Sequence, residues 1–359
     1  MWQPCEYQPS DLTSMLELAR DFYGNDRLAN EEFIRWQYFA NPAGKALIKL
    51  AKDPKSGHLV GQYIIIPTLF QSGEQLVTAT LSLNTLTKAA YQGQGIFTGL
   101  AKSVYQECVD KGVSFTYGFP NPNSYPGFIK KLNFKDLGQV PLMLRPLNLK
   151  SLVKTKMGTL MATLVSPLNP FFRVKTLNLK DKPSGIHLYE LTKDNLLELE
   201  PFWVKIKHKY PHMGVRSAAY MKWRYLDIPL REYKLFGAKD LQSDELLGYV
   251  VGRCTDVEGI SSGMIVDFLV DRAHPQAGHA LLSQILAVFQ DQNMQLAGTL
   301  MLEHCQEYKL LKQHGFFKCP KTFEPQPFPV IYRSHNTDST TEFPQLNNWF
   351  LTMGDYDVI

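Results

Sequence analysis

Residues 76–97 change from a two-residue hydrophobic period to a helical one. Residues 76–87 alternate, and one side carries Val77, Ala79, Leu81, Leu83 and Thr85. That alternation is typical of a strand. From residue 96 the apolar positions follow a period of about 3.6 residues, which predicts an amphipathic helix. Its apolar stripe comprises Ile96, Phe97, Leu100, Ala101, Val104, Tyr105, Cys108 and Val109.

The same patterns extend through the first half of the chain. Apolar stripes at helical spacing predict helices over residues 11–23 and 31–39, the second capped by Asn30. Residues 46–51 and 59–66 are predicted to be two strands of a hairpin, because the turn-forming segment 53–57 joins them. After the helix at residue 96, we expect a strand over residues 113–119 and a short helix over residues 121–132.

The second half repeats the first. Residues 33–38 match residues 220–225, and Trp36 and Trp223 each lie 25 residues before a glycine, Gly61 or Gly248 (61 − 36 and 248 − 223). A shared order and spacing predicts two copies of one fold. We interpret the two tryptophans as core anchors. We predict a first domain at residues 1–145, a basic linker at 146–185, a degenerate second domain at 186–335 and a docked C-terminal tail at 336–359.

A short glycine loop joins the strand to the helix in the first copy: Gln92, Gly93, Gln94 and Gly95. The start of a helix has unpaired N–H groups and partial positive charge, and glycines let a phosphate approach them. A pyrophosphate site is one interpretation, and a tight turn that needs glycine for its shape is the other. The spacing matches neither a Walker loop nor the dinucleotide fingerprint G-x-G-x-x-G.

Residues 92–97 resemble the Q/R-x-x-G-x-G/A signature of the GCN5-related N-acetyltransferases, the GNAT superfamily. Gln92 stands at the Q/R position and Gly95 at the first glycine, whereas Phe97 stands where Gly or Ala is usual. Residues 131–134, Lys-Leu-Asn-Phe, look like the family's K-L-G-F segment. The resemblance implies an α/β (α+β) fold with two tandem GNAT-like domains, each a mixed, mostly antiparallel sheet flanked by helices.

The resemblance also implies an acyl-CoA co-substrate bound by the first copy. Its pyrophosphate would lie on the loop and the first helical turn, its thioester near the end of the strand, and its pantetheine amides beside the next loop. The implied residues are Leu86, Thr87, Gln92, Gly93, Gln94, Gly95, Ile96, Phe97, Asn121 and Asn123. Capping is the alternative role of the two asparagines. The second copy has the loop 271–279 before a helix expected from Ala280, without the signature, so we expect little binding there.

Direct acyl transfer to an amine needs a base for the amine and, in many family members, a tyrosine acid for the thiolate. Ile129 occupies the family's tyrosine position. Tyr125, one helical turn earlier, is the nearest substitute. The alternative to a catalytic role is that Tyr125 is a structural residue of the core or of a loop. Candidate bases are Asp355, Asp357 and the terminal carboxylate of Ile359. Some related tandem acyltransferases use a terminal carboxylate. The tail is too apolar to remain in water, and the alternative is that it only seals the copies together.

Composition narrows the class of protein. The 359 residues carry a formal net charge of only +4, which argues against a nucleic-acid binder. Five cysteines without a C-x-x-C pair make a disulfide framework or metal site unexpected, and a reducing cytoplasm fits. There is no signal-peptide pattern and no run long enough to cross a membrane. Residues 149–165 could form a membrane-surface helix or, as we favour, a packed linker helix.

Three functional hypotheses follow. The first is an acyl-CoA-dependent N-acyltransferase, an N-acetyltransferase in the commonest form, acting on a small amine or a peptide amine. The second is a non-catalytic acyl-CoA sensor or scaffold, suggested by Ile129 and the degenerate second copy. The third is a peptidoglycan-bridge aminoacyltransferase, which the intact glycine loop and the lack of a coiled-coil arm disfavour. The acceptor, the acyl chain length, the general base and the oligomeric state stay open.

Overall fold

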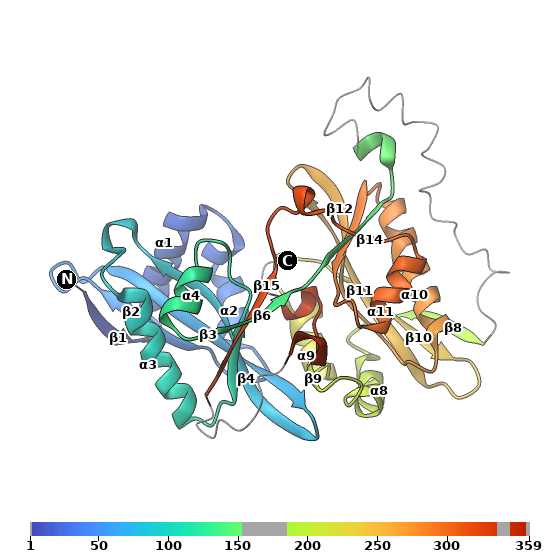
Figure 1. Cartoon of the computed structure of the whole chain (residues 1–359), viewed down its shortest axis with the longest axis horizontal. Helices are drawn as coiled ribbons and strands as arrows, with labels where there is room; N and C mark the ends of the chain where they lie inside the picture. Colours follow the sequence, from blue (N-terminus) through green and yellow to red (C-terminus); the bar gives the residue numbers. More distant parts are fainter. Residues whose placement is uncertain (1, 153–184, 336–344, 357–359) are drawn as a thin grey trace.

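The computed structural model describes residues 2–152, 185–335 and 345–356, and these form two mixed sheets with helices packed on them (Figure 1). The strands that lead to the first site are β1 (Gln3–Glu6), β2 (Leu47–Lys52), β3 (Leu59–Ser72), β4 (Gln75–Thr87), β5 (Phe115–Gly118) and β6 (Lys135–Gln139). The helices among them are α1 (Leu12–Tyr23), α2 (Glu31–Phe39), α3 (Ile96–Asp110) and α4 (Tyr125–Lys131).

The C-terminal half repeats this arrangement. The strands that follow β6 are β7 (Leu142–Pro146), which still belongs to the first half of the sequence, and β8 (Ile186–Glu190), β9 (His212–Gly214), β10 (Lys234–Asp240), β11 (Leu246–Val257), β12 (Ile260–Val270), β13 (Leu296–Leu300), β14 (Phe317–Lys318), β15 (Pro329–Ser334) and β16 (Trp349–Phe350). The helices of the C-terminal half are α8 (Leu199–Ile206), α9 (Ala218–Met221), α10 (Pro275–Asp291) and α11 (Gln306–Gln313). Short helical turns, including Lys222–Leu226, join several of these elements.

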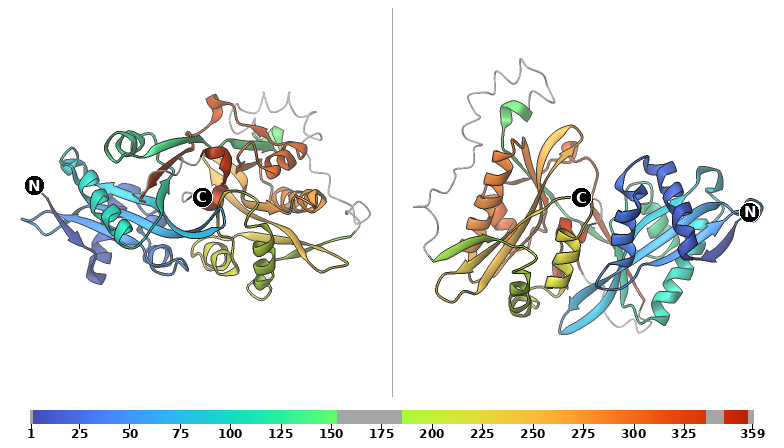
Figure 2. Two further views of the ribbon diagram at one scale, coloured as in Figure 1. Left: turned by 60° about the horizontal axis from the view of Figure 1, so that its bottom comes forward. Right: turned by 180° about the vertical axis from the view of Figure 1, so that it is seen from behind.

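Each sheet contains strands from the opposite half of the sequence, and the N-terminal sheet also takes in β9, which pairs with β3, and β16, which pairs with β9. The N-terminal sheet runs β1-β2-β3-β4-β5-β15-β6, so β15 lies between two strands of the first copy. The C-terminal sheet runs β14-β7-β13-β12-β11-β10-β8, so β7 lies between two strands of the second copy. The crossing connections are visible between the two sheets (Figures 1 and 2). Because neither sheet is complete without the other half, the two copies fold as one body.

Helices cover both faces of the N-terminal sheet. On one face, α3 packs over a cluster of buried residues that includes Tyr63, Ile65 and Leu100. On the other, α1 and α2 join a larger core that continues into the C-terminal sheet. Asn30 caps α2 as expected, with its Oδ1 accepting a hydrogen bond from the Phe33 N–H over 3.0 Å. The observed mixed sheets flanked by helices confirm the predicted fold class.

The two repeated tryptophans meet at the interface between the copies. The rings of Trp36 and Trp223 stack with centroids 4.9 Å apart and planes 19° apart. The indole N–H of Trp36 donates to the carbonyl of Trp223 over 2.8 Å, and that of Trp223 donates to the carbonyl of Trp36 over 3.1 Å. Such reciprocal contacts are what a local two-fold axis produces. The tryptophans therefore join the copies as well as filling the core.

One predicted boundary was wrong. The second copy's helix, α10, begins at Pro275 rather than at Ala280. Proline favours the first helical turn because its missing N–H would be unpaired there in any case. Gly278 consequently lies inside the helix and not in a loop. Of the predicted linker helix over residues 149–165, residues 149–152 are helical and the remainder lies outside the described residues.

Candidate functional site

A cavity opens where β4 and β5 separate. The two parallel strands pair from Ala79 with Phe115 to Ser82 with Gly118, and β4 then continues to Thr87 without a β5 partner. The cavity measures about 380 Å³. It is lined by residues 81–85 of β4 and by residues 118–121 at the end of β5 and just after it. We call it the β4–β5 cavity. The unpaired edge of β4 offers backbone N–H and C=O groups to a ligand laid along it.

Asn84 holds the bulge that turns β4 at this point. Its φ of 49° is left-handed, and the pairing of β3 with β4 shifts register here. Its side-chain amide donates to the Tyr38 hydroxyl over 2.7 Å and to the side-chain oxygen of Gln37 over 3.0 Å. Gln62 in turn donates to the Asn84 carbonyl over 3.0 Å. These bonds from α2 and β3 fix the strand end, and periodicity did not reveal them.

Leu86 and Thr87 form the end of β4, and the glycine loop follows. Leu86 is buried, whereas Thr87 is half-buried. The backbone carbonyl of Thr87 accepts a hydrogen bond from the side-chain amide of Gln92 over 3.4 Å. Neither residue lines the β4–β5 cavity itself. Their proposed contact with a thioester therefore stays a prediction.

The glycine loop is open to an incoming ligand. Gly93 and Gly95 have φ of 76° and 80°. A side-chain carbon at Gly93 would touch nothing within 4 Å, and one at Gly95 would meet only the Thr98 hydroxyl at 3.8 Å. Gly95 is the N-cap of α3 and no side chain caps the helix there, so its first turn can receive an anion. The Gln94 carbonyl accepts the Trp2 indole N–H over 2.9 Å, which steadies the loop.

Phe97 replaces the small residue of the signature because α4 makes room for it. Its ring packs edge-on against Phe128, with centroids 5.3 Å apart, and Phe128 lines the β4–β5 cavity. A side-chain carbon at Gly127 would lie 2.9 Å from the Phe97 ring. Ile96, next to it, is buried. The bulk of Phe97 thus lies in the packing between α3 and α4.

Asn121 lines the cavity and also caps a turn. Its side-chain oxygen accepts the backbone N–H groups of Asn123 and Ser124, both over 3.0 Å. Asn123 is exposed and does not line the cavity. The capping role of Asn121 is therefore observed, and contact of either asparagine with pantetheine stays a prediction.

Side chains fill the space beside the first helical turn of α10 in the second copy. A side-chain carbon at Gly278 would lie 2.6 Å from Leu310, so packing from α11 fills that position. Beside it, Glu307 is fully buried and accepts the Val270 N–H over 3.1 Å and the Lys209 ammonium over 2.6 Å. These contacts occupy the end of β12, which corresponds to the end of β4. The contrast supports the prediction that one copy alone binds the cofactor.

The described part of the C-terminal tail is buried between the copies. Trp349 packs edge-on against Phe70 and Phe115 of the N-terminal sheet, with centroids 5.5 and 5.6 Å away. On the other side Thr352 donates to Asp267 of β12 over 3.2 Å. The fully or nearly fully buried tail residues are Trp349, Phe350, Leu351, Met353 and Tyr356.

Asp355 belongs to a buried ion-pair network in that tail. Its two oxygens accept from the Arg216 guanidinium over 2.9 and 2.6 Å, and Arg216 also pairs with Asp267 over 2.8 Å. Arg216 is 1% exposed. Burial raises the pKa of Asp267, and the negative charge of Asp355 raises it further, against the attraction of Arg216. A carboxylate held by two guanidinium bonds and the Thr352 N–H is poorly placed to accept a further proton.

We expect Asp355→Asn to lower the free energy of unfolding by about 3 kcal/mol or more, because it leaves the buried Arg216 charge short of a partner. Urea denaturation measures this loss. Glu303→Gln is the matched control, because Glu303 forms an exposed pair with Lys318 over 2.7 Å, worth about 1 kcal/mol or less. Unchanged stability of Asp355→Asn together with lost turnover would instead identify Asp355 as the base. Asp357 and Ile359 lie outside the described residues.

Tyr125 begins α4 outside the cavity. Its hydroxyl donates to Asp136 over 2.6 Å, and this hydrogen bond is the main cause that raises the pKa of Tyr125. Its neighbours Ser124 and Phe128 line the β4–β5 cavity, but Tyr125 does not.

We expect Tyr125→Phe to leave turnover close to that of the parent protein, because the hydroxyl is engaged by Asp136 and lies outside the cavity wall. Thiol release under saturating substrate measures this. Asp136→Asn is the control for the hydrogen bond alone. A loss of about 100-fold or more in Tyr125→Phe, with coenzyme A affinity unchanged, would support the acid role.

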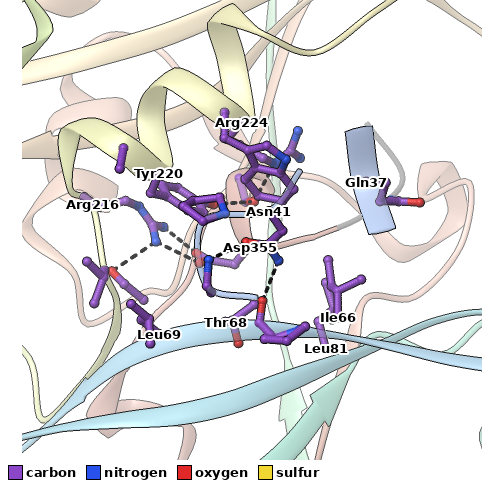
Figure 3. Close-up of a pocket in the computed structure, with 18 of the residues that line it drawn as sticks. Gln37, Asn41, Ile66, Thr68, Leu69, Leu81, Arg216, Tyr220, Arg224 and Asp355 are labelled. Atoms are coloured by element: carbon purple, nitrogen blue, oxygen red, sulfur yellow. Dashed lines mark hydrogen bonds and ion pairs between the residues drawn. The ribbon is translucent and has the colours of Figure 1, made fainter. Parts of the chain in front are cut away.

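A second cavity adjoins the first, between the two copies (Figure 3). It measures about 160 Å³, and we call it the interface cavity. Apolar side chains such as Ile66, Leu69 and Leu81 line one side, and Tyr220 and Arg224 line the other. Leu81 and Tyr356 are shared by the walls of both cavities. The two cavities therefore lie next to each other at Leu81 and Tyr356.

Among the described residues, no group of three or more His, Cys, Asp or Glu side chains is arranged to hold a metal ion. Across the same ranges, the helices lack the combination of length and apolar character that a membrane span requires.

Comparison with known proteins agrees with this geometry. Residues 5–135 match the family model described as an acetyltransferase (GNAT) domain. Similar solved structures include N-myristoyltransferase of Saccharomyces cerevisiae with bound myristoyl-CoA, at 12% identity and a TM-score of 0.62, covering 92% of this chain and 82% of that one. No curated protein sequence matches the chain.

Two bacterial structures are also similar. A GCN5-related N-acetyltransferase from Anabaena variabilis has 11% identity and a TM-score of 0.62, covering 94% of this chain and 73% of that one. A probable N-acyltransferase from Enterococcus faecalis has 12% identity and a TM-score of 0.58, covering 93% and 73%. At such identities the likeness concerns the fold, and it extends over both copies.

Proposed function

We propose that this chain, whose residues 5–135 match the acetyltransferase (GNAT) domain, is an acyl-CoA-dependent N-acyltransferase. One observation carries the proposal: β4 loses its β5 partner after Ser82, and the chain then leads into the uncapped start of α3 at Gly95. A strand edge suits the amides of pantetheine, and the helix start suits a pyrophosphate. The two lie one after the other along the chain, in the order in which coenzyme A presents these groups.

Transfer would follow direct attack. The neutral amine nitrogen bonds to the thioester carbonyl carbon, and the oxyanion is stabilised by backbone N–H groups near the end of β4. The carbon–sulfur bond then breaks, and coenzyme A leaves as a thiolate. The amine's proton passes to a base, and the thiolate takes up a proton from an acid or from water. The products are an amide and free coenzyme A.

The C-terminal tail is the proposed source of the base. Tyr356, the last described residue, lies in the walls of both cavities. Its ring packs edge-on against Phe119, which follows β5, with centroids 4.8 Å apart. Asp357 and Ile359 follow Tyr356 in the sequence and lie outside the described residues, and we retain both as candidates.

The acyl group is proposed to be acetyl, the commonest in the superfamily. Myristoyl-CoA is the ligand in the similar yeast structure, so longer chains belong in the test. The competing hypothesis is a non-catalytic acyl-CoA sensor, favoured by Ile129 at the family's tyrosine position and by the bond between Tyr125 and Asp136.

Mass spectrometry of the purified protein for retained acyl-CoA, followed by an amine panel with thiol detection, tests the proposal. We expect binding of acetyl-CoA or a longer acyl-CoA, and thiol release that depends on an added amine. Binding without thiol release over the whole panel would favour the sensor. Absence of any coenzyme A binding would contradict both hypotheses.

A further inference from the structure

Arg231 is a half-buried arginine in the wall of the interface cavity. It forms no ion pair with a carboxylate in the described ranges, and its hydrogen-bond partner is the Tyr233 hydroxyl. Its guanidinium carbon lies 5.8 Å from the centre of the Phe33 ring, a contact with no negative charge. Burying a charge without a counter-ion is costly, so such an arginine is a candidate ligand contact.

Other cations surround Arg231. Burial, and then the charges of Arg27, Arg253 and Arg224, lower its pKa to about 10, and only Tyr233 opposes them. Arg27 approaches the same Phe33 ring, at 5.7 Å, and lies in the wall of the β4–β5 cavity. Arg27 pairs with Asp26 over 3.7 Å, and Asp355, the carboxylate in the wall of the interface cavity, is held by Arg216 over 2.6 Å. The field at this end of the interface cavity is therefore positive and would attract an anion.

The remainder of the interface cavity is mainly apolar, apart from polar groups that include the Arg216–Asp355 pair, and it adjoins the β4–β5 cavity. The rings of Phe33, Trp36 and Tyr220 form part of its wall. Because Leu81 and Tyr356 are common to both cavities, a molecule here would lie next to an acyl group in the β4–β5 cavity. The site thus combines an apolar chamber, a cationic wall and access to the thioester.

We propose that the acceptor is an apolar amine that also carries a carboxylate, with its apolar part in the interface cavity and its carboxylate on Arg231. This inference rests on the proposed function and names its substrate class. A guanidinium matches a carboxylate in geometry and can donate two parallel hydrogen bonds to it. An amine without the carboxylate would bring a second positive charge to an already cationic wall, which favours the carboxylated amine further.

The test uses the full chain, acetyl-CoA and matched amines. L-leucine and L-phenylalanine are compared with isoamylamine and phenethylamine, which lack the carboxylate, and O-phosphoethanolamine supplies a phosphate. A charged hydrogen-bonded contact is worth about 1.5–3 kcal/mol, so we expect kcat/KM to be about 10- to 100-fold higher for the amino acids. A preference for O-phosphoethanolamine, or for the amines without an anion, would overturn the proposal.

Arg231→Gln should raise KM for the preferred amino acid about 10- to 100-fold, with little effect on phenethylamine. Arg231→Lys should restore part of the loss, since it keeps the charge but not the paired donors. Arg253→Gln is the matched control, because it removes one charge of the same cluster outside the cavity wall.

The melting temperature and acetyl-CoA affinity of each variant separate this inference from the proposed function. Equal KM in Arg231→Gln and the parent protein, with acetyl-CoA bound and amines turned over, would overturn the acceptor class alone. Failure to bind acetyl-CoA in the parent protein would overturn the proposed function instead.

Discussion

Replacing Gly95 with valine is expected to abolish measurable coenzyme A binding. The side chain would stand at the uncapped start of α3, where a phosphate must approach the backbone N–H groups closely. The structure leaves room for it apart from Thr98, so steric overlap should not unfold the protein. A β-branched residue at φ 80° is strained, however, at a cost of about 1–3 kcal/mol. Isothermal titration with coenzyme A measures the lost affinity.

Gly112→Val provides the matched control for that strain. Gly112 has a φ of 68°, lies just beyond the other end of α3 and has nothing within 4 Å of a new side-chain carbon. It should lose similar stability and retain coenzyme A binding. Gly278→Val would be a poorer control, because its side chain would collide with Leu310. Normal affinity in Gly95→Val, or loss of affinity in Gly112→Val, would show that the loop does not hold the pyrophosphate.

Deletion of residues 357–359 is expected to lower turnover by about 100- to 10,000-fold, the range of a lost general base. A deletion from Asp355 would also remove the buried pair with Arg216, so the shorter truncation is the cleaner experiment. It leaves Arg224 bonded to the carbonyl of Gly354 over 3.2 Å. Stability and coenzyme A affinity should therefore hold while the rate of thiol release falls.

Two companion variants identify the carboxylate. Asp357→Asn removes one candidate and keeps the terminal group. Addition of one glycine after Ile359 moves the terminal carboxylate and keeps Asp357. Only the variant that disturbs the base should reproduce the loss of turnover seen on truncation. Full turnover in the truncated protein would mean that the tail only packs between the copies.

The sequence by itself determined the elements around the glycine loop. The end of β4 at Thr87 and the start of α3 at Ile96 agree with the change of hydrophobic period, because both depend on residues close together in the chain. The same holds for α2, which begins after its Asn30 cap. The repeat around Trp36 and Trp223 likewise indicated two copies, since similar sequences form similar local structure.

Only the tertiary structure decided what these elements pair with. β15 enters the first sheet and β7 enters the second, and strand partners so distant in sequence are chosen by packing and register rather than by local period. The pairing of Arg216 with Asp355 and the lack of a carboxylate partner for Arg231 depend on the fold, which brings together groups far apart in the chain. The sequence made Asp355 a candidate base, and the structure adds that it is the counter-ion of Arg216; its catalytic role stays a prediction, because the environment of a carboxylate sets its chemistry.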